Sequence, residues 1–294
     1  MKKNIIALLP FKNEEQFLPN YMDSIALVAD KLIAVDDYST DKSVEIINSK
    51  AKELNLNVDI IQAIPKRTND WYVDKTRQYL LELGRQSNGT HFICLDADEC
   101  FTKQFSYNLN RIVQSLKPGF KVQMQWLAMW KSLDHFRNDQ SVWSNNFKDF
   151  IFCDNGEFNF INDAYFCDPR TPGPNNENNT LKLNPKYGAV MHFQFSDWKK
   201  FQIKQCWYRC REKIYGKSDQ SINDKFKITL DDSNVFLEAC TENWMPTHEL
   251  PNINLDVSIE NNWHLKEIKN MFQEHGKEEF NGLNIWHVLE INKL

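Results

Sequence analysis

The first hundred residues alternate between short apolar runs and segments whose apolar residues recur at helical spacing. The apolar runs are typical of buried strands, and the segments between them are typical of amphipathic helices. Strand and helix in repeated succession predict a parallel, doubly wound sheet of the α/β class. The predicted strands cover residues 5–9, 32–35, 58–61 and 91–95, and the helices between them include residues 17–28, 44–47 and 72–84.

The pattern changes after residue 99. Apolar residues alternate with polar ones over 121–130, which predicts a strand exposed on one face. The stretch from 131 to 168 is rich in aromatic residues and has no regular apolar pattern, so we expect short strands and loops there. Residues 168–180, rich in Asn and Pro, predict a loop. Further helices are predicted over 105–116, 198–214 and 263–272, and a further strand over 187–195.

Polar residues follow three of the first four predicted strands, at positions 11–14, 36–37 and 96–99. In doubly wound sheets, ligands bind outside the carboxyl ends of the strands. We therefore expect these three clusters, which are distant in the sequence, to meet at one edge of the sheet. A ligand site is predicted at that edge.

The third cluster, Asp96-Ala97-Asp98-Glu99, is the most informative. Strand alternation would place Asp96 and Asp98 on the same side. Two such charges ~5 Å apart repel by roughly 3 kcal/mol at an effective dielectric constant of ~20. A divalent cation that carries a phosphate would offset this repulsion. A helix amino terminus that attracts acids, or a solvated turn, are the simpler interpretations.

Composition and missing motifs exclude several classes of protein. With 41% hydrophobic and 26% charged residues, the chain is typical of a globular protein, and its net charge of -5 argues against a general nucleic-acid binder. Neither Gly-x-Gly-x-x-Gly nor the full Gly-x-x-x-x-Gly-Lys-Ser/Thr pattern occurs, so a dehydrogenase, a Rossmann methyltransferase or a P-loop ATPase is not expected. A phosphate held without a Gly-rich loop needs a metal, which favours the metal interpretation of the acidic cluster.

The seven cysteines are scattered and include no Cys-x-x-Cys pair, so neither a disulfide framework nor a zinc ribbon is predicted. A reducing compartment suits such a chain best. The apolar run near the amino terminus is too short for a signal peptide or a membrane span. We therefore expect a cytoplasmic protein without a transmembrane segment.

Four segments in order, "LLPFKNEEQFLPNYMDSI", "LIAVDDYSTDKS", "KTRQYLLELG" and "FICLDADE", resemble the family-2 glycosyltransferases of the GT-A fold. The resemblance covers roughly the first hundred residues. It implies a nucleotide-sugar donor (a UDP-, GDP- or dTDP-sugar), a divalent cation (Mn²⁺ or Mg²⁺) and transfer with inversion at the anomeric carbon. Hard carboxylate oxygens would hold the cation, and the cation would bridge the diphosphate.

Residue roles follow from the resemblance by position. Asp37 would contact the base or the ribose, and Arg77 would reach the base or brace its neighbours. Asp96 would bind the ribose or a metal-bound water, and Asp98 the metal itself. A helix cap at Asp37 and a surface salt bridge at Arg77 are the simpler alternatives. The nucleoside pocket would be lined by Pro10, Phe11, Asn13 and Glu14.

His192 lies in an apolar predicted strand, where a histidine is usually a core residue. Enzymes of this fold often take a further metal ligand from a histidine after the acceptor loops, so the resemblance also makes His192 a candidate ligand. An imidazole would favour Mn²⁺ over Mg²⁺.

Inverting transfer needs a base that accepts the proton of the acceptor hydroxyl. Many relatives carry a His-Glu pair where this chain has Cys167-Asp168. We predict Asp168 as the base, although the departure from His-Glu weakens the match. Arg170 would hold a phosphate or an acidic acceptor, or form a salt bridge in its loop. The other carboxylates considered for the base are Asp149, Asp154 and Asp163.

These expectations define the domain organisation. A GT-A domain is predicted over 1–195, with a nucleotide-sugar half (1–100), a smaller acceptor-side subsheet (101–195) and a mainly helical extension over 196–294. The basic, aromatic helix over 198–214 would pack on the core, or else contact a membrane surface or an anionic acceptor.

The predicted function is metal-dependent glycosyl transfer to a glycan, lipid-linked or protein acceptor, without nucleic acid. A catalytically silent module of the same fold, binding glycan or a partner enzyme, is the alternative. A nucleotidyltransferase would share the sheet and the metal but normally begins with a Gly-rich loop, which is absent.

Overall fold

The computed structural model describes residues 3–63, 73–160, 170–173, 177–241, 244 and 262–291. The chain forms two compact units. The first unit comprises residues 1–127, 145–192 and 240–253, and the second comprises 128–144, 193–239 and 254–294. The functional division predicted from the sequence, 1–195 and 196–294, stays a prediction.

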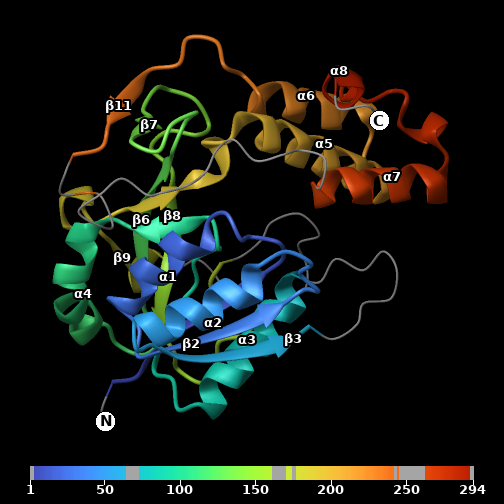
Figure 1. Cartoon of the computed structure of the whole chain (residues 1–294). Helices are drawn as coiled ribbons and strands as arrows, with labels where there is room; N and C mark the ends of the chain where they lie inside the picture. Colours follow the sequence, from blue (N-terminus) through green and yellow to red (C-terminus); the bar gives the residue numbers. More distant parts are fainter. Residues whose placement is uncertain are drawn as a thin grey trace. The chain divides into compact units, whose positions relative to one another are not determined.

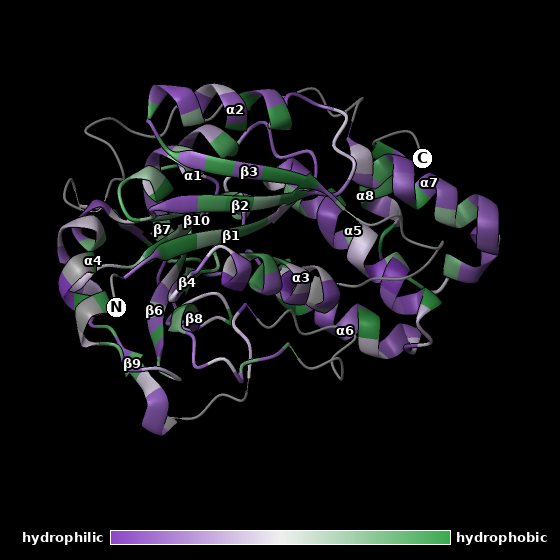
Figure 2. Cartoon of the chain, turned by 90° about the horizontal axis from the view of Figure 1, so that it is seen from below, coloured by the Kyte–Doolittle hydropathy of each residue, from purple (hydrophilic) through white to green (hydrophobic). Residues whose placement is uncertain are grey.

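The first unit is built on a parallel half-sheet in the order β3-β2-β1-β4, of which Figure 1 labels β2 and β3 and Figure 2 labels all four strands. Its central strand β1 pairs in parallel with β2 on one side and β4 on the other, and Phe11 lies opposite Asp36. The carboxyl ends of these strands therefore share one edge, as the sequence predicts. The four strands are β1 (Ile5–Phe11), β2 (Lys31–Asp36), β3 (Asn57–Gln62) and β4 (His91–Ile93).

Helices cover both faces of this half-sheet. Figure 2 shows α1 and α2 on one face and α3 on the other, with apolar strands between them. Pro19 lies in the first turn of α1, where its missing N–H costs no hydrogen bond. The α/β class and the alternation of strands and helices are thus confirmed. The helices of this unit are α1 (Leu18–Ala26), α2 (Ser43–Glu53), α3 (Val73–Gln86) and α4 (Lys103–Ser115).

Beyond β4 the sheet continues in the order β8-β6-β10-β5, and β9 pairs with β6. β8 is antiparallel to both β4 and β6, and β10 is antiparallel to β5. The predicted strand over 187–195 is shorter than expected, because a 3-10 turn over Phe193–Phe195 ends it. These strands are β5 (Glu99–Phe101), β6 (Lys121–Ala128), β8 (Phe147–Cys153), β9 (Thr180–Lys182) and β10 (Val190–His192).

The described part of the second unit contains four α-helices and a two-stranded sheet. α5 packs against α6, α7 and α8, and it buries residues as large as Phe201 and Trp207. These contacts are with helices of the same unit, so packing of residues 198–214 on the core of the first unit stays a prediction. No helix in the described ranges combines the length and apolarity needed to cross a bilayer. The elements are α5 (Trp198–Ile214), α6 (Asp219–Thr229), α7 (Trp263–His275), α8 (Trp286–Ile291), β7 (His135–Arg137) and β11 (Leu237–Ala239).

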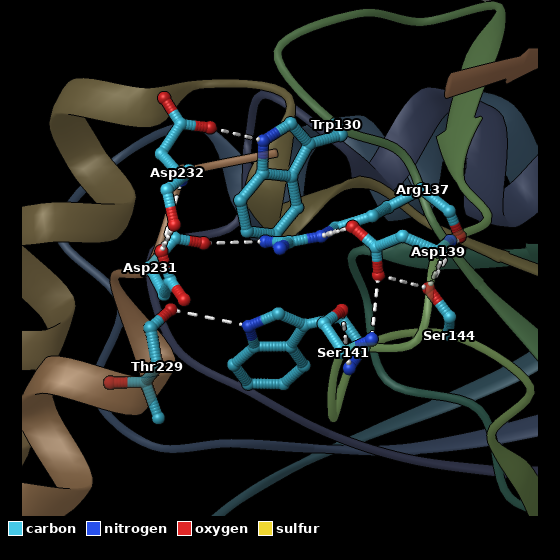
Figure 3. Close-up of polar contacts among 10 residues, drawn as sticks. Trp130, Arg137, Asp139, Ser141, Ser144, Thr229, Asp231 and Asp232 are labelled. Carbon is cyan, nitrogen blue, oxygen red and sulfur yellow. Dashed lines mark hydrogen bonds and ion pairs between the residues drawn. The ribbon is translucent and has the colours of Figure 1, made fainter. Parts of the chain in front are cut away.

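A buried arginine organises the loops beside β7 and β11 (Figure 3). The Arg137 guanidinium lies 4.4 Å from the Trp130 ring centroid, and it donates to Asp139 at 2.6 Å and to the carbonyl of Asp231 at 2.7 Å. The indole N–H of Trp130 donates to Asp232 at 2.8 Å. A planar donor stacked on an aromatic ring suits arginine and not lysine. The network therefore fixes the 128–144 segment to the loop that follows α6.

His91 at the start of β4 makes the stability of the first unit depend on pH. Burial, and secondly the charge of Lys3, lower the pKa of His91 from 6.5 to about 4. Between these values the unfolded chain takes up a proton that the folded protein does not, so the unfolding free energy should fall as the pH drops from 6.5 to 4. His91→Gln should flatten this dependence in urea denaturation at a series of pH values. An unchanged slope in the variant would contradict the assignment.

Candidate active site

Three acidic side chains follow β4, and arginine neutralises two of them. Arg77 of α3 donates to Oδ1 of Asp96 at 2.8 Å, and Arg170 lies 2.8 Å from Oδ2 of the same carboxylate. The same Nη1 atom of Arg170 donates to Oε2 of Glu99 at 2.7 Å. The repulsion predicted from the sequence is therefore offset in the protein by two guanidinium groups. Arg77 is no surface salt bridge, because only 2% of it is exposed.

The two arginines determine the ionisation of Asp96. Burial alone would raise its pKa, but Arg170 and Arg77 outweigh burial and lower the pKa to about 2. For Glu99, burial raises the pKa to about 8, with Asp96 and Asp98 adding to the rise and Arg170 opposing it. Asp96 is therefore a permanent acceptor at the edge of the sheet where a ligand is expected.

Strand pairing brings Asp98 next to His192. β10 and β5 are antiparallel, and His192 is the direct partner of Glu99. Nε2 of His192 consequently lies 3.3 Å from Oδ1 of Asp98, and both side chains are buried. The structure thus brings together the two predicted metal ligands. Within the described ranges, no group of three or more His, Cys, Asp or Glu side chains is arranged to hold a metal ion.

Trp126 of β6 completes the cluster, and the sequence analysis did not identify it. Its indole N–H donates to Oε1 of Glu99 at 2.6 Å, and its ring stacks on His192 at 4.2 Å between centroids. Lys148 of β8 lies 3.7 Å from the centroid of the same ring. The only sequence signal was the alternating pattern of β6, which places Trp126 among core residues and does not distinguish it from them.

The loops after β1 and β2 are joined by hydrogen bonds. The backbone N–H of Asn13 donates to the hydroxyl of Ser39 at 2.9 Å, and its side-chain carbonyl accepts from the N–H of Thr40 at 2.7 Å. The N–H of Glu14 donates to the Ser43 hydroxyl at 2.8 Å. Asn13 has a φ of 53°, a left-handed conformation that asparagine tolerates well. Asn13 is therefore used to fix the geometry of both loops.

The remaining predicted nucleoside residues lie at the same edge. Phe11 is buried at the end of β1, and Pro10 before it is partly exposed. Asp37, just past β2, is partly exposed and lies 4.0 Å from Nζ of Lys12. Oδ1 of the neighbouring Asp36 accepts from the N–H of Ser39 at 2.9 Å, in a turn that precedes α2 (Ser43–Glu53) and does not cap it.

Residues 7–119 match the family model described as Glycosyl transferase family 2. This segment belongs to glycosyl transferase family 2. The resemblance seen in the sequence is thereby confirmed for the part of the chain that holds the loops after β1 and β2, Asp96 and Asp98. No curated protein sequence matches the chain.

Solved structures similar to this chain include two bacterial proteins. TarS 1-349 from S. aureus in complex with UDP is 19% identical with a TM-score of 0.32, over 43% of this chain and 35% of that one. A longer TarS structure is 13% identical with a TM-score of 0.43, over 95% and 50%. Glucosyl-3-phosphoglycerate synthase from Mycobacterium tuberculosis with Mg²⁺ and UDP is 20% identical with a TM-score of 0.30, over 43% and 44%. The chain thus spans half or less of the length of each.

The catalytic base predicted from the sequence, Asp168, lies outside the described residues, as does Asp163. Two other candidates are described, and both form ion pairs. Asp154 accepts from Arg85 through both oxygens at 2.8 Å, and its backbone N–H bonds the carbonyl of Thr90 before β4, at the end of the strand opposite Asp96. Asp149 lies 3.7 Å from the buried Lys121. Asp154 therefore serves the structure of the sheet.

Proposed function

We propose that this protein is a metal-dependent glycosyltransferase that moves a sugar from a nucleotide-diphosphate donor to a glycan, lipid or protein acceptor with inversion. The observation that carries the proposal is the contact between Asp98 and His192 beside an arginine-held Asp96, at the ligand-binding edge of a family 2 domain. Such a site needs no Gly-rich loop to hold phosphate, since a cation and fixed positive charges replace it.

The donor atoms present fit a divalent cation. Adjacent ligands of an octahedral cation, each at ~2.1 Å, lie ~3.0 Å apart. Oδ1 of Asp98 and Nε2 of His192 are separated by 3.3 Å, close to this value. Cations of this kind are usually held by one or two protein groups together with substrate phosphates and water. Asp98 and His192 would be the protein groups, and a nitrogen ligand favours Mn²⁺ over Mg²⁺.

The bound cation would neutralise charge that develops on the leaving diphosphate. The chain's own residues would do the rest. Asp96, kept ionised by Arg77 and Arg170, would accept hydrogen bonds from the donor's ribose or from water. The joined loops of Asn13 and Glu14 would hold the nucleoside without rearranging, which lowers the entropic cost of binding. Asp168 is our proposal for the group that takes the acceptor proton.

The alternative is a catalytically silent family 2 module that binds glycan. Thermal unfolding with UDP, GDP or dTDP, each with and without Mn²⁺, separates the two functions. We expect stabilisation only when one nucleotide and Mn²⁺ are both present, of about 2.7 kcal/mol at a ligand concentration 100 times Kd. The matched control is the corresponding nucleoside monophosphate, which cannot bridge the cation through a diphosphate. Stabilisation by an oligosaccharide alone would favour the binding module and contradict our proposal. The cytoplasmic location and any contact with a membrane surface stay predictions.

A further inference from the structure

Glu99, Trp126 and His192 form a closed ring of contacts on three strands of the first unit. β5 and β10 pair so that Glu99 and His192 are direct backbone partners. β6 neighbours β10 on its other side, and Trp126 of β6 reaches both residues through its ring face and its N–H. Each member of the ring is thus held by the other two.

The indole of Trp126 has almost no freedom to move. Only 4% of the residue is exposed. The ring planes of Trp126 and His192 lie at 25° to each other, and Nζ of Lys148 lies 3.7 Å from the centroid of the indole ring. The 2.6 Å hydrogen bond to Glu99 fixes the rotation of the ring in its own plane. A rigid aromatic surface therefore lies against the imidazole.

We propose that Trp126 is a positioning residue that sets the plane of the His192 imidazole, so that Nε2 is aimed at the cation beside Asp98. The proposal rests on the proposed function, because it concerns the same metal site. Second-sphere groups that orient a ligating histidine are usually carboxylates or carbonyls, and their loss costs 10–100-fold in metal affinity. Here a stacked indole, itself oriented by Glu99, performs that task.

An ordinary core tryptophan would contribute to stability and leave metal binding unchanged. The two roles therefore differ in the affinity for Mn²⁺ and in the preference for Mn²⁺ over Mg²⁺. Loss of imidazole orientation removes the nitrogen ligand that favours Mn²⁺, so the preference should decrease together with the affinity. A loss of stability alone would change neither quantity in the folded protein.

The experiment measures free Mn²⁺ by electron paramagnetic resonance during titration of the full-length protein, with and without UDP, GDP or dTDP. Trp126→Phe keeps an aromatic face against His192 but loses the N–H donated to Glu99. Trp126→Leu loses both. We expect Mn²⁺ to bind ~10-fold more weakly to the first variant and ~100-fold more weakly to the second. Competition with Mg²⁺ should show a reduced Mn²⁺ preference in the same order.

Trp143→Phe is the matched control, since it also removes an indole N–H, one that donates to the carbonyl of Thr229 in the second unit at 3.2 Å. It should bind Mn²⁺ as the unchanged protein does. Should Trp126→Leu fail to fold, Mn²⁺ binding to Trp126→Phe, which keeps an aromatic ring, still tests whether Trp126 positions His192. Equal Mn²⁺ affinity in the unchanged protein and Trp126→Phe would overturn the positioning role and leave the proposed function standing. Failure of the unchanged protein to bind Mn²⁺ with any nucleotide would overturn both.

Discussion

Asp98→Asn should lower sugar transfer in the presence of Mn²⁺ by about 10³-fold, because a cation's stabilisation of the leaving group amounts to several kcal/mol and each 1.36 kcal/mol is a factor of ten. The amide has nearly the volume of the carboxylate but lacks its charge. The fold should survive, since the substitution also relieves repulsion from the ionised Asp96. Initial rates at saturating donor and nucleotide-dependent Mn²⁺ binding are the two measurements.

Asp59→Asn is the matched control for this substitution. Asp59 lies on β3, its side chain is 49% exposed, and it pairs with Lys31. Exposed pairs of this kind contribute at most about 1 kcal/mol to stability and nothing to a distant cation. Transfer by Asp59→Asn should equal that of the unchanged protein. Full activity of Asp98→Asn would contradict the proposal that a cation held by Asp98 assists sugar transfer.

Arg77→Met should lower the unfolding free energy by about 3 kcal/mol, the lower end of the range for breaking a buried ion pair. Methionine fills similar space but leaves Oδ1 of Asp96 without its 2.8 Å partner among the pairs described. The lower end applies because Arg170 still holds Oδ2 and 29% of the Asp96 side chain is exposed. Urea denaturation followed by circular dichroism is the appropriate measurement.

Arg111→Met provides the comparison, since Arg111 is an exposed residue of α4. Exposed substitutions of this kind usually change stability by less than about 0.5 kcal/mol. If Arg77 also contributes to nucleoside binding, the Kd of the Arg77→Met variant for nucleotide should rise even at temperatures where the variant is fully folded. Equal stability of the two variants would show that the Arg77–Asp96 pair contributes little to the fold.

The parallel half of the sheet was predictable because its signals are local. Apolar runs such as 5–9 and 32–35 define the strands, and polar residues follow each of them. Parallel pairing then requires their carboxyl ends to share an edge, whichever side chains are present. Nothing more than strand order is needed to bring the loops of Asn13 and Asp37 together.

The neutralisation of the acidic cluster was not predictable in the same way. The repulsion between Asp96 and Asp98 could be calculated from their spacing. Either arginine or a cation could offset this repulsion, and the sequence pattern does not distinguish the two. Arg170 follows a stretch of sequence with no periodic pattern, so its position has no local signal. The contact of Trp126 with Glu99 likewise depends on which strand lies beside β10, a property of topology that alternation does not encode.

The antiparallel pairing of β5 with β10 has a consequence for assembly of the protein. Asp98 and His192 are about ninety residues apart in the sequence, and in the described sheet they meet through one short ladder. Closing so long a loop carries an entropic cost, which the three backbone pairs offset together with the contacts of Trp126 to Glu99 and His192. The nucleotide loops, in contrast, depend on strands that are neighbours in the sequence. Partial unfolding should therefore separate the two proposed cation ligands while the loops after β1 and β2 stay joined, so we expect weaker Mn²⁺ binding to be the earliest sign of damage to the proposed site.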